Sequence, residues 1–149
     1  MNSYTMQASK KNQIKKLLDK LGFVLQENSK EIYYKSYAGY VIEIDFDKET
    51  INYGNKINYG NKTQSNNKTT QNFSQPENFV VLECVDRLLD KGYKPQNIIL
   101  EKIYPTEHET AGKLDICVTH NDGSEYLLIE CKTYGKEFDG AFDRMKKDG

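Results

Sequence analysis

The stretch GKLDICVTHNDGSEYLLIECK, residues 112–132, decides the predicted fold. Two apolar runs, 113–119 and 125–132, alternate as β-strands do and flank Asp122 and Gly123. Asp-Gly is a strong signal for a two-residue type I′ turn, because both central residues of that turn need a positive φ. The stretch therefore predicts a β-hairpin with Asp122 and Gly123 at its tip.

This turn predicts which residues face each other across the hairpin. Counting outward from the tip places Asp115 opposite Glu130. Opposed Cβ atoms lie ~4.5–5.5 Å apart, and like charges there destabilise a sheet. Lys132 shares a strand face with Glu130, because side chains alternate, so it or a bound cation is expected to offset the two acids. The opposite face is predicted to be the core side, with Leu114, Ile116, Val118, Leu127, Ile129 and Cys131.

Paired carboxylates at the end of an apolar hairpin suit a divalent cation. Mg²⁺ prefers oxygen ligands and keeps several waters, and it can activate water for attack on phosphorus. Zinc is not expected, because the two histidines lie in polar loops without a Cys-x-x-Cys pair nearby. The alternative is a metal-free cross-strand salt-bridge cluster, worth ~0–1 kcal/mol per pair.

The segments before the hairpin predict a helix and a strand. Residues 74–92 favour a helix in which Ser74 and Glu77 have capping-box spacing and Gly92 marks the end. A strand is predicted at 97–105. Glu101 lies within this strand and is interpreted as a surface residue paired with Lys102. His120, beside the predicted hairpin turn, is interpreted as a loop histidine.

The N-terminal part predicts a separate module, residues 1–60. A lysine-rich amphipathic helix over 9–21 has Ser9 as a possible cap and Gly22 as its end. Its basic face is interpreted as solvated surface rather than a DNA contact. A β-hairpin follows over 31–46, turning at Ala38 and Gly39.

Two features separate this module from the rest. The hexapeptide INYGNK occurs twice, at 51–56 and 57–62, and is interpreted as a duplicated loop, because two units are too few for a solenoid. The polar residues 61–75 are predicted to be a flexible linker. The remaining residues, 76–149, are predicted to be the main domain.

Composition favours a cytoplasmic protein with one main domain. The 149 residues are 37% hydrophobic and 29% charged, and the net charge is -1. Residues 1–76 carry eleven lysines against seven acidic residues, so the remainder is acidic. The N-terminus lacks the apolar centre of a secretory signal. Three widely spaced cysteines in apolar runs favour reduced thiols.

A family resemblance rests on two short motifs. LDICV (114–118) followed by IECK (129–132) resembles the D…ExK signature of the PD-(D/E)xK nuclease superfamily, with Leu114 where a proline is usual. Residues 72–149 resemble the N-terminal nuclease region of bacterial type I and type I-like restriction-modification polypeptides, and IKKLLDKLGFVL (14–25) is similar too.

The resemblance implies an α/β (α+β) restriction-endonuclease-like core of a helix, a three-stranded mixed sheet and a second helix at 136–149. A fourth core strand would follow, so the chain is expected to be a fragment. The implied catalytic residues are Asp115, Glu130 and Lys132. The implied metal ligands are Asp115, Glu130 and the backbone carbonyl of Cys131. Glu83 is a further implied ligand, which the resemblance supports less directly.

The implied function is a Mg²⁺-dependent endonuclease domain that hydrolyses double-stranded DNA, with Mn²⁺ expected to substitute. Its implied partners are methyltransferase, helicase-like motor or specificity segments, and an open sheet edge makes a homodimer possible. Tyr134 and Lys136 follow the motif and are interpreted in two ways. They either contact a phosphate or are simply a turn tyrosine and a lysine at the start of a helix. The rival hypothesis is a catalytically inactive nuclease-like module that binds DNA or docks onto a subunit.

Overall fold

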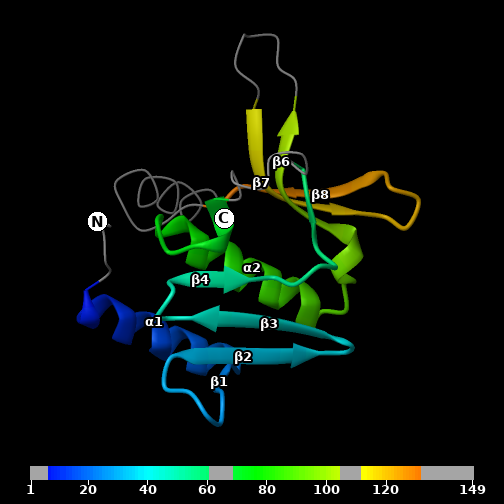
Figure 1. The fold of residues 1–149 in the computed structure, drawn as a ribbon. Helices are drawn as coiled ribbons and strands as arrows, with labels where there is room; N and C mark the ends of the chain where they lie inside the picture. The colour runs from blue at the N-terminus through cyan, green and yellow to red at the C-terminus, as the bar shows by residue number, and fades with distance from the viewer. Residues whose placement is uncertain (1–6, 61–68, 105–111, 132–149) are drawn as a thin grey trace, which may run out of the picture.

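The computed structural model describes residues 7–60, 69–104 and 112–131. Within these ranges the chain has a mixed α+β fold with two α-helices and two four-stranded sheets (Figure 1). The predicted helix at 136–149 lies outside the described residues. Neither α-helix of the described chain has the length and apolarity needed to cross a membrane.

The first sheet follows the N-terminal helix and is antiparallel throughout, in the order β1-β2-β3-β4. The predicted hairpin is confirmed, with its turn at Ala38 and Gly39. The helix ends as predicted, where Gly22 adopts a φ of 95°. It begins at Ala8 without a side-chain cap, so Ser9 lies inside it. The elements are α1 Ala8–Leu21, β1 Val24–Leu25, β2 Ile32–Tyr37, β3 Tyr40–Asp45 and β4 Thr50–Asn52.

The second sheet has the order β5-β6-β7-β8. The predicted succession of one helix and three strands is confirmed, and these three strands pair antiparallel. The mixed character of the sheet comes from β5, which pairs parallel to β6. The elements are β5 Asn58–Tyr59, η2 Thr69–Gln71, α2 Glu77–Asp90, η3 Pro95–Asn97, β6 Ile98–Tyr104, β7 Gly112–Thr119 and β8 Glu125–Ile129.

The two INYGNK copies provide edge strands to different sheets, so their interpretation as a duplicated loop is wrong. The first copy overlaps β4, which pairs with β3, and the second contains β5, which pairs with β6. The isoleucine and tyrosine of each copy are buried, because they point into the core from both strands. They are Ile51, Tyr53, Ile57 and Tyr59.

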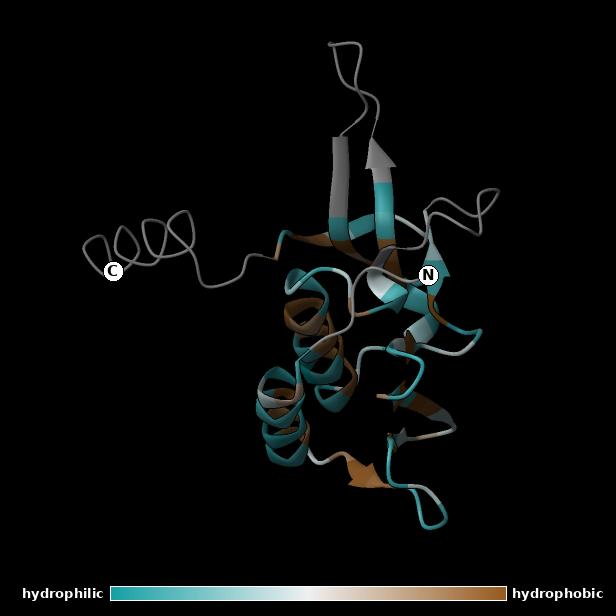
Figure 2. Ribbon diagram, turned by 60° about the vertical axis from the view of Figure 1, so that its left-hand side comes forward, coloured by the Kyte–Doolittle hydropathy of each residue, from teal (hydrophilic) through white to brown (hydrophobic). Residues whose placement is uncertain are grey.

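One hydrophobic core joins the two halves of the chain. Figure 1 shows α1 and α2 on the same side of the first sheet, with α2 also running beneath the second. Brown hydrophobic residues recur along both helices in Figure 2. Eight of the 14 residues of α2 are buried. This helix therefore serves both sheets.

The described part of the predicted linker contributes to that core. Phe73 is only 2% exposed, and its ring lies 5.4 Å from that of Phe46 and 4.9 Å from that of Phe79. Residues 61–68 lie outside the described ranges. The polar residues around Phe73 gave no sign that its aromatic ring packs between the two halves.

The predicted capping box at the start of α2 is wrong. The Ser74 hydroxyl donates to the side-chain oxygen of Asn72 and not to the helix. Pro76 occupies the N-cap position, and no side chain caps α2. The buried amide of Asn78 donates to the Asn72 carbonyl at 2.8 Å, so Asn72 organises this corner through both its side chain and its backbone.

A buried ionic network ties β2 to both helices. The Lys35 ammonium donates to Asp86 at 2.7 Å, to Asp90 at 3.0 Å and to the Leu21 carbonyl at 2.6 Å. The Tyr37 hydroxyl also donates to Asp86, at 2.7 Å. The Lys35 and Asp86 side chains are 16% and 3% exposed. The Asp86 charge is therefore removed from water, and the Lys35 ammonium and the Tyr37 hydroxyl offset the loss.

We expect Gly60→Ala to destabilise the fold by about 2 kcal/mol, as overpacking does. A Cβ at Gly60 would lie 2.4 Å from the Lys102 Cα and 2.8 Å from the Glu101 carbonyl oxygen, and both are backbone atoms that cannot rotate away. Chemical denaturation measures the effect. Gly92→Ala is the control, because its φ of 100° is unfavourable but nothing lies within 4 Å of the added Cβ. An equal or smaller loss at Gly60 would contradict the packing.

Lys35→Met is expected to lower the free energy of unfolding by about 3 kcal/mol, because it leaves Asp86 charged, buried and without its cation. Arg87→Met is the matched control. Arg87 also pairs with a carboxylate of α2, at 2.6 Å, but its side chain is 67% exposed, so its loss should cost about 0.5 kcal/mol or less. Equal effects in denaturant titrations would refute a structural role for the buried pair.

The same network predicts loss of stability at alkaline pH. Burial lowers the pKa of Lys35, but its hydrogen bonds to Asp86 and Asp90 outweigh burial and raise it above 10.5. Burial and Asp86 raise the pKa of Tyr37 above 10.0. Groups with raised folded-state pKa values contribute stability that is complete below their unfolded-state values and decreases above them. Unfolding free energies measured from pH 8 to 11 should fall, and fall less in a Lys35→Met/Tyr37→Phe variant.

Candidate functional site

The hairpin of β7 and β8 has the predicted alignment over most of its length. Ile116 faces Ile129 and Cys117 faces Leu128. Continuing this alignment by one residue places Asp115 opposite Glu130, just beyond the end of β8. The two acids of the proposed site thus come from neighbouring strands at one end of the hairpin.

The tip of the hairpin differs from the prediction. His120 N–H donates to the Ser124 carbonyl at 2.8 Å, and Gly123 N–H donates to the His120 carbonyl at 2.9 Å. The loop therefore has three residues, with Gly123 at a φ of 90°, and the predicted two-residue type I′ turn is wrong. Asp122 accepts hydrogen bonds from the backbone and hydroxyl of Ser124, which stabilises this longer turn.

An irregularity in the strands restores the predicted alignment. Thr119 faces Glu125, but Val118 faces Leu127. Tyr126 is therefore the additional residue of a β-bulge. The three-residue loop and the bulge offset each other, so the residues next to Asp115 keep the alignment that the simpler turn predicted.

Asp115 supports the backbone where β8 ends. One of its carboxylate oxygens accepts a hydrogen bond from the Cys131 N–H at 2.7 Å. Regular strand pairing stops at Ile129, so the carboxylate holds the following segment against β7. Asp115 is half-buried and Glu130 is exposed. The site therefore has one fixed acid and one that faces solvent.

Cys131 connects these acids to α2. Its sulfur lies 3.8 Å from that of Cys84. The hydrogen bond to Cys84 raises the pKa of the Cys131 thiol, as do burial and the negative charges of Asp115 and Glu130. The same hydrogen bond lowers the pKa of Cys84. Of the two carboxylates, Asp115 contacts Cys131 directly, through the backbone N–H.

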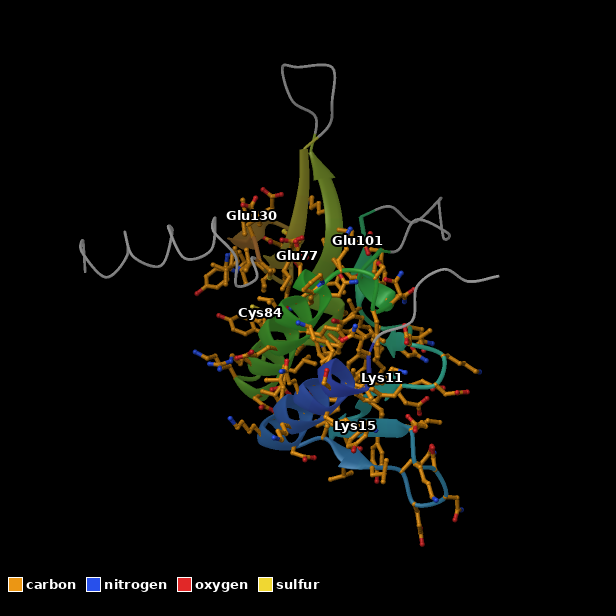
Figure 3. The ribbon with its side chains drawn as sticks, turned by 90° about the vertical axis from the view of Figure 1, so that its left-hand side faces the viewer. Lys11, Lys15, Glu77, Cys84, Glu101 and Glu130 are labelled. Atoms are coloured by element: carbon orange, nitrogen blue, oxygen red, sulfur yellow. The ribbon has the colours of Figure 1, made fainter. Side chains whose placement is uncertain are left out.

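The position of Cys84 shows which face of α2 turns toward the hairpin. Glu77 lies seven residues earlier, two helical turns away on the same face. Figure 3 shows Glu77 toward the end of the molecule that carries Glu101 and Glu130. The sequence reasoning used Glu77 only as a cap residue.

The other predicted site residues have different placements. Glu83 lies about 100° around the helix from Cys84 and pairs with Arg87 at 2.6 Å. Lys132 lies outside the described residues. His120 is exposed in the hairpin loop, as predicted, with its ring 4.9 Å from that of Tyr126.

Glu101 is buried, so its interpretation as a surface residue paired with Lys102 is wrong. It is 1% exposed and accepts hydrogen bonds from the Thr70 N–H at 3.0 Å and the Thr70 hydroxyl at 2.6 Å. Its backbone has a φ of 56° inside a strand. Lys102 pairs with Glu125 instead, at 3.0 Å. No local pattern reveals the partner of Glu101, because Thr70 is 31 residues away.

The donors at the hairpin end fit a hard cation only in part. Asp115, Glu130 and the Cys131 carbonyl supply oxygen, which Mg²⁺ prefers, and Mg²⁺ is often held by one or two carboxylates together with water and substrate phosphates. Within the described residues, however, no three His, Cys, Asp or Glu side chains are grouped to hold a metal ion. A cation here would depend on few protein ligands.

Comparisons with protein-family models, with curated proteins and with solved structures found no match for this chain.

Proposed function

We propose that this chain is a metal-dependent endonuclease domain that hydrolyses DNA phosphodiester bonds as part of a restriction system. The observation that supports it most is the alignment of β7 with β8, because it brings the acids of the D…ExK motif to one end of a hairpin. The order of α2 and the three strands agrees with the proposed core.

Each acid has a distinct part in this proposal. Asp115, held by the Cys131 N–H, is the rigid ligand, and exposed Glu130 completes the pair from the neighbouring strand. A bound Mg²⁺ would supply stabilisation of the negative charge that develops on the phosphate. Lys132 is proposed to orient the attacking water and to add positive charge beside the phosphate.

Two acids of α2 have weaker support as ligands, because neither is grouped with the hairpin acids among the described residues. Glu77 has the better position, because it shares the face of α2 that carries Cys84. Glu83 is already engaged with Arg87 on a neighbouring face, so its part as a ligand has less support.

The rival function is a nuclease-like module without catalysis that binds DNA or docks onto a subunit. The hydrogen bond between Cys131 and Asp115 supports it, because it gives one acid of the motif a structural use. In that case the acids serve structure alone, and the Cys131 N–H is one group that Asp115 binds.

Asp115→Ala, Glu130→Ala and Lys132→Ala are each expected to abolish DNA cleavage by the complete enzyme. Loss of a positioned acid-base group alone typically lowers a rate by ~10²–10⁴-fold. A plasmid nicking assay in Mg²⁺ measures this, and any methyltransferase or ATPase activity should persist. Asp122→Asn, at the hairpin tip, is the control that should cut normally. Unchanged cleavage in all three variants would eliminate the nuclease assignment.

Metal binding by this chain is a second test. Titration with Mn²⁺, followed by the electron paramagnetic resonance of the free ion, should show binding at millimolar concentrations or below. Glu130→Gln should weaken it, because an amide lacks the charge that attracts the cation, whereas Glu83→Gln should have little effect. An intact fold that binds no Mn²⁺ would favour the non-catalytic module.

A further inference from the structure

Cys84 and Cys131 are the two thiols that lie together in this fold. Their sulfur atoms are 3.8 Å apart, although the residues are 47 positions apart in the chain. A disulfide has a bond of about 2.05 Å, so the sulfurs need to approach by less than 2 Å. Both cysteines are reduced in the structure, and so is buried Cys117.

The two thiols differ in access to solvent. Cys84 is half-buried on α2, whereas Cys131 is 7% exposed at the end of β8. An oxidant therefore reaches Cys84 first, and Cys131 lies behind it in position to react next. This is the arrangement of an oxidation-sensitive thiol beside a resolving thiol.

We propose that Cys84 and Cys131 form a reversible disulfide in response to peroxide, and that this bond regulates the neighbouring acidic site. The regulatory half of the inference rests on the proposed nuclease function, whereas the disulfide itself does not. Transient disulfides of this kind are the usual form in reducing compartments.

The chemistry needs only hydrogen peroxide as oxidant. The Cys84 thiolate attacks one peroxide oxygen, the O–O bond breaks and hydroxide leaves, which gives a sulfenic acid. The Cys131 sulfur then attacks that sulfur as its thiol proton is lost, the S–S bond forms, and the S–O bond breaks with loss of a second hydroxide. The two thiol protons convert both hydroxides to water. Two thiols are oxidised and one peroxide is reduced.

The consequence for the site follows from the position of Cys131. Its N–H holds the Asp115 carboxylate at 2.7 Å, and it is the residue next to Glu130. Drawing its sulfur toward α2 moves the backbone that carries this N–H. Oxidation should therefore change the position of one acid and the segment that carries the other, and weaken cation binding.

Treatment of the full chain with hydrogen peroxide, followed by proteolysis and mass spectrometry, tests the disulfide. We expect a peptide pair linked through Cys84 and Cys131 that disappears with dithiothreitol. Cys117→Ser should leave it unchanged, and Cys84→Ser should eliminate it. Oxidation of Cys84 to sulfinic acid with Cys131 still a thiol, or a link between two chains, would overturn the proposal.

Mn²⁺ titration of the reduced and oxidised chain tests the regulation. Binding should be at least about fivefold weaker after oxidation, in the usual range of coupling between sites, and Cys84→Ser should show no such change. Equal affinity in the two forms would overturn regulation. If the reduced chain binds no Mn²⁺ while the disulfide still forms, the proposed nuclease function and its regulation both fail. The proposed disulfide between Cys84 and Cys131 is then still supported.

Discussion

The structure depends on α2 packing against both sheets at once. A helix that is buried over most of its surface has little room for charge, yet α2 carries Asp86 at 2% exposure. Such a carboxylate is tolerated only where cations and donors satisfy it, and Lys35 and Tyr37 of β2 do so. The ionic contact and the buried apolar residues of α2 together set the rotation of this helix about its axis. With that rotation fixed, Cys84 faces the end of β8 and Glu83 does not.

The duplicated hexapeptide has a physical role in the same arrangement. Because β4 and β5 follow each other closely, one short segment borders both sheets. The two copies have glycine at equivalent positions, Gly54 and Gly60, but the structure requires glycine there for different reasons. Gly54 has a φ of 74°, whereas Gly60 allows its backbone to approach that of β6. The repeat therefore connects the halves that its polar surroundings suggested were separate.

Sequence patterns predicted the local elements well, because strand alternation and Gly ends are local signals. Both helices, the Ala38–Gly39 hairpin and three strands of the second sheet were predicted in this way. Long-range partners were not predictable by the same means. Ser74 had ideal spacing for a cap, but Asn72 lay closer to its hydroxyl. Glu101 resembled an exposed strand residue, but it is buried and accepts hydrogen bonds from the distant Thr70. The hairpin tip was wrong while the alignment of its strands was right, because loop length and bulge offset each other.

Cys131 concentrates three constraints in one residue. Its backbone holds Asp115, its thiol contacts α2, and its neighbour in the chain is Glu130. One carboxylate oxygen of Asp115 accepts the hydrogen bond from the Cys131 N–H. This bond restricts how the second carboxylate oxygen can point toward a ligand. The geometry of the acidic site is therefore coupled to the position of α2, and through Asp86 to the first sheet. Displacement of α2 would change the positions of Asp115 and Glu130 through the contact between Cys84 and Cys131. This effect does not need a direct contact between the N-terminal half and the acids. This coupling gives the N-terminal half an influence on the site that follows from the contacts themselves, whether the acids bind a metal or serve structure alone.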